Sequence, residues 1–289
     1  LAISGNAFAL GNWTAETENI SLQAETLSQD FETLRQRQEA LDGLVARLEE
    51  TGDLRDGVSL SLIDLSDPAN PAKAGYRQDV LTYPACTIKL AILFGIYNKA
   101  ASEPGLLERE ITIERKNMTG TGHVDACPYP DLEPGQTWTI GDLAKVMVMR
   151  SDNVAAAHLI DVVGRENVTA LMRTIGCENT YLWRKVYSGY PVSDPTEQQY
   201  ANKSNRSTTA DIAHLLLLMA SGQLVSPEAS AQMYDIIKGN LFRHKIGAGI
   251  LADAVYAGKT GTTSTVSHDS AIVAGPGRKY VIVVYTSLD

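Results

Sequence analysis

The 289-residue sequence lacks several features that mark particular classes of protein. No apolar run approaches the roughly 20 residues that cross a bilayer, so we expect no membrane span. Positive charge is scarce, with 25 Lys and Arg against 34 Asp and Glu and a formal net charge of -9. Nucleic acids and anionic lipids require a basic face, so this balance disfavours both as partners. A small-molecule or peptide substrate fits better, while the sequence does not indicate an oligomeric state.

Cysteine is also scarce, with Cys86, Cys127 and Cys177 as the only examples. The sequence has no Cys-x-x-Cys pair and its five histidines are scattered, so we expect neither a metal site nor a cofactor. An odd count leaves at least one free thiol. Cys127 and Cys177 either form a disulfide or remain as two buried thiols. The absence of internal repeats excludes a solenoid.

Strand patterns occur at both ends of the chain. Residues 57–65 alternate Val58, Leu60 and Leu62 with serines, which predicts a half-buried strand, and residues 74–77 form a plausible partner. Three further strands are predicted near the C-terminus, at residues 255–262, 269–274 and 279–287.

Helical patterns fill the middle of the sequence and one segment near its start. The predicted helices are residues 25–50, 84–100, 139–149, 153–163, 166–175, 212–220 and 226–238. We therefore expect an α/β fold in which an antiparallel sheet is flanked by helices and carries an all-helical insertion. The expected parts are an irregular arm (1–23), a discontinuous sheet domain (24–82 and 207–289) and an all-helical domain (83–206), in which 177–206 form a long loop.

The stretch around Cys86-Thr87-Ile88-Lys89 is a candidate catalytic centre, since Pro84 opens a predicted helix there. Residues three apart share a helix face, so the Cys86 sulfur and the Lys89 amine can point into one cleft. A helix N-terminus and a nearby ammonium both favour a thiolate, so Cys86 is a candidate nucleophile and Lys89 its base.

Two further motifs stand in the same order as those of a known superfamily. Ser151-Asp152-Asn153 lies at a predicted helix junction, and Lys259-Thr260-Gly261 lies on a predicted C-terminal strand. Together with the Cys86 box, this trio resembles the signature of the class A β-lactamases and penicillin-binding proteins, across roughly residues 25 to 289. That superfamily has serine where this sequence has Cys86. The cysteine is either native or an engineered replacement of serine.

The resemblance implies a role for each matching residue. Cys86 would form the acyl-enzyme, and Lys89 would manage the proton of this nucleophile. Ser151 would relay a proton to the leaving nitrogen. The backbone amides of Cys86 and Thr262 would form the oxyanion hole. Substrate contacts would come from the remaining residues of the motifs, namely Asn153, Lys259, Thr260 and Gly261.

The sequence departs from the class A pattern after the Ser-Asp-Asn helices, where these enzymes carry a glutamate that frees the acyl-enzyme. Residues 182–189 contain no carboxylate. Asp194 and Glu197 follow further along, and we expect both to be solvated loop charges. Without a placed base, attack of water on a thioester loses about 10² to 10⁴ in rate, so deacylation by water should be slow.

Several functions remain open at this point. The first is a β-lactamase-like enzyme that attacks a β-lactam or peptide-like amide through Cys86. The alternatives are a natural-product acyltransferase or amidohydrolase on the same fold, and a β-lactam sensor that stays acylated. The resemblance implies a secreted or periplasmic protein, with the cytoplasm as the alternative. It also implies a helix after the last strand, whereas this sequence stops at Asp289. Either that helix is trimmed from the sequence, or the arm or a partner covers that face.

Overall fold

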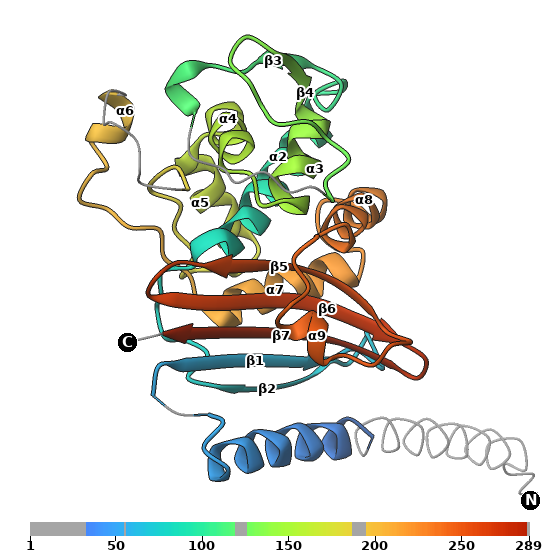
Figure 1. The fold of residues 1–289 in the computed structure, drawn as a ribbon. Coiled ribbons are helices and arrows are strands. Elements are labelled where there is room, and N and C mark those ends of the chain that lie inside the picture. The colour runs from blue at the N-terminus through green and yellow to red at the C-terminus, as the bar shows by residue number, and fades with distance from the viewer. Residues whose placement is uncertain (1–32, 55, 119–125, 187–194, 288–289) are drawn as a thin grey trace, which may run out of the picture.

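A five-stranded antiparallel sheet lies between the larger helices and the helix of residues 33–50, with strand order β2-β1-β7-β6-β5 (Figure 1). The computed structural model describes residues 33–54, 56–118, 126–186 and 195–287. The strands are β1 (Val58–Asp64), β2 (Ala72–Tyr76), β5 (Val255–Thr262), β6 (Val266–Gly275) and β7 (Arg278–Ser287). The pairing of β1 with β7 joins the two ends of the chain, as the sequence predicted.

Strand β1, which lies between β2 and β7, shows how the sheet is covered on both faces. Leu60 and Leu62 pack against the helix formed by residues 33–50, through side chains such as Leu44. Ser59 and Ser61 face the other way and are buried, and Ser61 donates a hydrogen bond of 2.9 Å to Thr209 Oγ1. The sequence predicted a half-buried strand, but a hydroxyl partner on α7 (Thr209–Ala220) allows the serine face to be buried as well.

The larger helices lie on the opposite side of the sheet from the helix of residues 33–50 (Figure 1). The core is centred on α2 (Lys89–Ser102), whose first nine residues are buried. Thr139, Thr208 and Ser226 cap α3, α7 and α8, accepting hydrogen bonds of 3.0 to 3.1 Å from backbone amides. The helices that follow α2 are α3 (Ile140–Met149), α4 (Asn153–Val163), α5 (Arg165–Thr174), α6 (Pro195–Gln198), α7, α8 (Pro227–Lys238) and the single turn α9 (Ile246–Gly249).

Three details differ from the sequence prediction. The region expected to be all-helical also carries a two-stranded sheet, β3 (Glu110–Thr112) paired with β4 (Thr137–Thr139). The nucleophile helix opens as a 3-10 turn, η1 (Ala85–Ile88), before α2 begins. The expected loop of residues 177–206 contains α6. At its end, Arg206 forms an isolated antiparallel β-bridge with Tyr181, and the next residue, Ser207, forms one with Thr82. Short pieces of this kind lack a periodicity long enough to detect.

Some expectations concern parts of the chain outside the described residues. The arm at residues 1–23 and the first turns of the helix predicted from residue 25 are among them. Within the described ranges, no helix is long and apolar enough to cross a membrane.

Candidate active site

Cys86 lies in the η1 turn, where the backbone makes an unusual bend. Ala85 has φ of +46°, a left-handed conformation that L-residues seldom adopt. Thr87 holds the turn, because its hydroxyl donates to the Pro84 carbonyl at 2.7 Å and lies 2.5 Å from the Tyr285 hydroxyl on β7. The turn is therefore fixed to the sheet while Cys86 itself remains partly exposed.

Lys89 follows one turn later and connects Cys86 to the helical region. Its side chain is fully buried, and Nζ donates to the Ser151 carbonyl at 2.6 Å and to Asn153 Oδ1 at 2.7 Å. Nζ also lies 3.3 Å from Ser151 Oγ. The structure thus brings together the first two motifs that the sequence singled out.

Ser151 occupies the junction between α3 and α4, as the sequence predicted. Its φ of +59° turns the chain sharply between the two helices. Asp152 begins α4 by accepting a hydrogen bond of 2.9 Å from the Ala155 amide, and a buried ion pair with Arg150 at 3.0 Å holds its carboxylate. This local structure turns the Ser151 hydroxyl toward the lysines.

Strand β5 supplies the third motif. Lys259 is fully buried and donates to Ser151 Oγ and to the Thr260 carbonyl, both at 2.8 Å. Gly261 lies so close to the nucleophile turn that a Cβ there would stand 2.9 Å from the Cys86 amide nitrogen. A glycine is needed for this approach. Thr262 comes next and ends the strand.

The two lysines change the acidity of the nucleophile. Burial by itself raises the pKa of the Cys86 thiol, but the charges of Lys89 and Lys259 and a hydrogen bond with Ser151 outweigh it and bring the pKa to about 7. Burial also lowers the pKa of Lys259 to about 7, against the opposing effect of the Cys86 thiolate, and lowers the pKa of Lys89. Near neutral pH the site therefore holds substantial fractions of both the Cys86 thiolate and the Lys259 ammonium.

A third lysine at the site was missed by the sequence analysis. Lys245 Nζ donates to Thr262 Oγ1 at 2.8 Å, to the His268 carbonyl at 3.0 Å and to the Gly261 carbonyl at 3.2 Å. The buried Asp269 accepts a hydrogen bond of 3.0 Å from the Ile246 amide and so fixes the adjoining backbone. Lys245 lies in an irregular stretch without a motif, so no sequence signal marked it.

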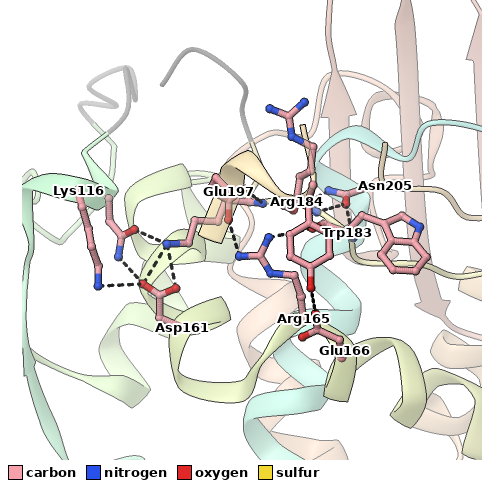
Figure 2. A network of polar contacts seen from close by, with 11 residues as sticks. Lys116, Asp161, Arg165, Glu166, Trp183, Arg184, Glu197 and Asn205 are labelled. Atoms are coloured by element: carbon pink, nitrogen blue, oxygen red, sulfur yellow. Dashed lines mark hydrogen bonds and ion pairs between the residues drawn. The ribbon is translucent and has the colours of Figure 1, made fainter. Parts of the chain in front are cut away.

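Ionic contacts with α4 and α5 fix the segment that begins at residue 182, after the Ser-Asp-Asn helices (Figure 2). Lys185 is buried and contacts Asp161 at 2.8 Å and Asn117 Oδ1 at 2.7 Å. Val186 is 4% exposed and belongs to the main core.

Glu197, which we expected to be a solvated loop charge, is in fact buried. It pairs with Arg165 and accepts a hydrogen bond of 3.3 Å from the Lys185 amide. That expectation was wrong because an arginine at the start of α5, distant in sequence, neutralises this carboxylate. Asp194 lies outside the described residues.

The remaining cysteines do not form the disulfide considered above, since both are free. Cys177 is a buried thiol whose Sγ donates to the Asp211 carbonyl at 3.2 Å, whereas Cys127 is only partly buried. In the part of the chain that the structure describes, no group of three or more His, Cys, Asp or Glu residues could hold a metal ion.

Comparisons with known proteins bear on the family and the fold. Beta-lactamase L2 of Stenotrophomonas maltophilia is 26% identical over 182 residues, which are 62% of this chain and 55% of that relative, so the match spans little more than half of its length. Among solved structures, a β-lactamase from Sphaerobacter thermophilus superposes with a TM-score of 0.66 at 21% identity, over 80% of this chain and 82% of that one. A PBP-A variant in an acyl-enzyme complex with penicillin G gives a TM-score of 0.67 at 22% identity, over 86% of each chain. The sequence profile of the Beta-lactamase enzyme family matches residues 44–288, and the chain belongs to that family.

Proposed function

We propose that this protein attacks an amide bond, in a β-lactam or a peptide-like substrate, through the Cys86 sulfur and forms a thioester acyl-enzyme. Membership of the β-lactamase family supports a hydrolase that acts on amide bonds. The observation that carries the more specific proposal is the partly exposed Cys86 thiol, whose pKa of about 7 results from Lys89, Lys259 and Ser151. A nucleophile with this pKa is ionised to a large extent at neutral pH.

In the acylation step, the Cys86 thiolate adds to the substrate carbonyl carbon, and the carbonyl oxygen becomes an oxyanion. The amides of Cys86 and Thr262 are the proposed donors to it, and the close approach of Gly261 to Cys86 supports this pairing. The carbon–nitrogen bond then breaks, and the nitrogen takes a proton from Ser151 Oγ. Lys89 or Lys259 resupplies that proton, since both nitrogens lie within 3.3 Å of the hydroxyl.

Substrate binding is assigned to the β5 edge and to Asn153. The Asn153 amide, oriented by its hydrogen bond with Lys89, would contact the substrate amide. Lys259 is fully buried, so a substrate carboxylate would meet mainly Thr260 and the more accessible Lys245, which already bonds to Thr262. An ammonium flanked by hydroxyls is a suitable site for a carboxylate.

The described residues offer less support for deacylation, the second half of the reaction. Among the described residues of the segment that begins at residue 182, Glu197 is the carboxylate that could serve as a base, and its ion pair with Arg165 holds it away from that role. A thioester persists when no water is activated to attack it, and an amine acceptor attacks it more readily than unactivated water does. This arrangement favours acyl transfer or a long-lived acyl-enzyme over rapid hydrolysis.

Burst kinetics with a chromogenic β-lactam would test the proposal under reducing conditions. We expect a burst of one β-lactam ring opened per chain, followed by slow turnover that an added amine accelerates with formation of a new amide. A burst unaffected by amines would support the sensor alternative. Rapid multiple turnover without a burst would contradict slow deacylation, and the absence of any ring opening would contradict the proposed function.

A further inference from the structure

His268 on β6 is a fully buried side chain that the proposed mechanism does not use. Its ring Nδ1 accepts a hydrogen bond of 3.1 Å from the Thr286 amide, and Nε2 lies 2.9 Å from the Tyr83 carbonyl oxygen. Because Nδ1 accepts from an N–H group, we assign the proton of the neutral ring to Nε2, which donates to Tyr83. Burial lowers the pKa of His268 to about 4, so the ring is neutral near pH 7.

The ring of His268 also stacks on Tyr285, its partner across β6 and β7, with the ring centroids 4.1 Å apart. Such a stack holds both rings in a defined orientation. The Tyr285 hydroxyl in turn lies 2.5 Å from the Thr87 hydroxyl oxygen. The two stacked side chains therefore contact the nucleophile turn on both sides of Cys86, at Tyr83 before it and at Thr87 after it.

The position of His268 in the sheet relates the nucleophile turn to β5. His268 pairs directly with Gly261 on β5, and directly paired residues face the same side of a sheet. That side is the one on which the backbone of Gly261 approaches Cys86. The turn itself includes the left-handed Ala85, a conformation that persists only where the surrounding contacts enforce it. The bond from His268 to Tyr83 is one of these contacts and lies two residues before Ala85.

We propose that His268 is a positioning residue for acylation: by donating to the Tyr83 carbonyl, it holds the turn of Cys86 at a fixed distance from β5. At that distance the amides of Cys86 and Thr262 can donate to one oxyanion. This role rests on the proposed attack on an amide, and it involves no proton transfer by His268, because backbone groups bind both ring nitrogens. The His268 carbonyl accepts from Lys245 at 3.0 Å, and a change of side chain leaves this contact in place, so substrate binding should be retained.

Two substitutions separate the two hydrogen bonds of the ring. His268→Gln can place an N–H donor near the position of Nε2, whereas His268→Asn reaches only the position of Nδ1. At saturating chromogenic β-lactam, we expect acylation to slow by about a hundredfold in His268→Asn and by less than about fivefold in His268→Gln. The substrate concentration at half-saturation should stay within about twofold in both variants. Equal losses in the two variants, or normal acylation by His268→Asn, would overturn the proposal.

Alkylation of Cys86 by iodoacetamide separates the position of the turn from the acidity of the thiol. This reaction needs the thiolate but no oxyanion hole, so its rate should stay within about threefold in both variants. The rate is followed on the Cys86 peptide because Cys127 is also partly exposed. A loss of alkylation in His268→Asn as large as its loss of acylation would overturn the positioning role.

His158 on α4 provides a matched control for the loss of a buried histidine. Its Nδ1 donates to the Val154 carbonyl at 2.8 Å, and its Nε2 accepts from the Glu114 amide at 2.9 Å, so backbone groups bind both nitrogens there as well. We expect His158→Asn to leave acylation unchanged. A hundredfold loss in His158→Asn would show that removing any such ring is sufficient, and would overturn the specific role of His268.

Hydrogen exchange of the Thr87 amide, which donates to the Pro84 carbonyl at 3.1 Å, reports on the turn without any substrate. We expect this amide to exchange at least about tenfold faster in His268→Asn and at nearly the original rate in His268→Gln. The Ala229 amide at the start of α8 should be unaffected. Unchanged exchange of Thr87 in His268→Asn would overturn the proposal. Faster exchange there, together with no acylation even by the unsubstituted chain, would support the hold of His268 on the turn and contradict the proposed function alone.

Discussion

Lys259 donates a hydrogen bond of 2.8 Å to the hydroxyl of Ser151, a residue 108 positions away in the sequence. Through this bond, strand β5 and the junction between α3 and α4 meet beside Cys86. Lys89 reaches the same hydroxyl from the other side, at 3.3 Å. The arrangement gives the Ser151 hydroxyl two lysine neighbours.

Removing the charge of Lys89 should suppress the thiolate. In Lys89→Met the largest favourable influence on the charged form of Cys86 is lost, so its pKa should rise from about 7 toward the ordinary value of 9.0. The thiolate fraction at pH 7 then falls by about fiftyfold, and alkylation by iodoacetamide should slow accordingly. The control is Lys238→Met, an exposed lysine on α8. An unchanged alkylation rate in Lys89→Met would rule out the assigned role.

The pH dependence of acylation should be bell-shaped. The thiol pKa of about 7 means that the Cys86 thiolate is lost as the pH falls below 7. The Lys259 pKa of about 7 means that its positive charge is lost as the pH rises above 7. The two apparent values belong to the coupled group, so the maximum should lie near neutrality. Alkylation by iodoacetamide needs only the thiolate and should reach a plateau instead. Acylation that continues to rise well above pH 8 would show that the Lys259 charge is dispensable.

Lys245 should matter for substrate affinity more than for the nucleophile. In Lys245→Met, we expect KM for a β-lactam bearing a carboxylate to rise by about tenfold, because one charged hydrogen bond to the substrate is lost. The same variant should leave KM unchanged for an ester of that β-lactam. An equal loss on both substrates would indicate a structural effect on β5 rather than recognition of the carboxylate.

The close approach of β5 to the nucleophile turn can be tested with one methyl group. Gly261→Ala places a Cβ 2.9 Å from the Cys86 amide nitrogen and 3.1 Å from the Pro84 carbonyl, so the strand and the turn must separate. We expect acylation to slow by about a hundredfold, the usual cost of losing an oxyanion donor. Gly249→Ala is the matched control, because a Cβ there meets nothing within 4 Å. Normal acylation by Gly261→Ala would contradict the assigned oxyanion hole.

The Arg165–Glu197 pair should contribute to stability. Arg165 is 4% exposed and also donates to the Trp183 carbonyl at 2.9 Å. Arg165→Met would leave a buried carboxylate without its partner and should lower the free energy of unfolding by about 3 to 5 kcal/mol. Urea denaturation measures this. The exposed pair of Arg35 and Glu39 provides the comparison, and Glu39→Gln should cost less than about 0.5 kcal/mol. Equal losses would show that burial of the pair adds nothing.

Much of the fold was predictable because its elements have long and regular patterns. The strands around Leu60 and Val283 and the helices capped by Thr139 and Thr208 were located from periodicity and capping residues alone. The three motifs were recognised together, since their order and spacing match a known superfamily although each alone is a weak signal. The structure brings Lys89 and Lys259 to the Ser151 hydroxyl beside Cys86, and Asn153 to Lys89.

What escaped prediction depends on contacts between distant segments. Burial of Ser61 requires the Thr209 hydroxyl on α7, and burial of Glu197 requires Arg165 on α5. Lys245 reaches Thr262 from an irregular stretch after α8, so neither periodicity nor spacing marks it. Such polar side chains look like ordinary surface residues until the tertiary structure supplies their partners.

The most direct test of the central claim is the mass of the protein after incubation with penicillin G, followed by peptide mapping. We expect one adduct with the full mass of the penicillin on the peptide that contains Cys86, formed fastest near pH 7. The adduct should be absent in Cys86→Ala and should move to the introduced hydroxyl in Cys86→Ser. Absence of an adduct in both the chain with Cys86 and Cys86→Ser, or an adduct on another residue, would contradict the account.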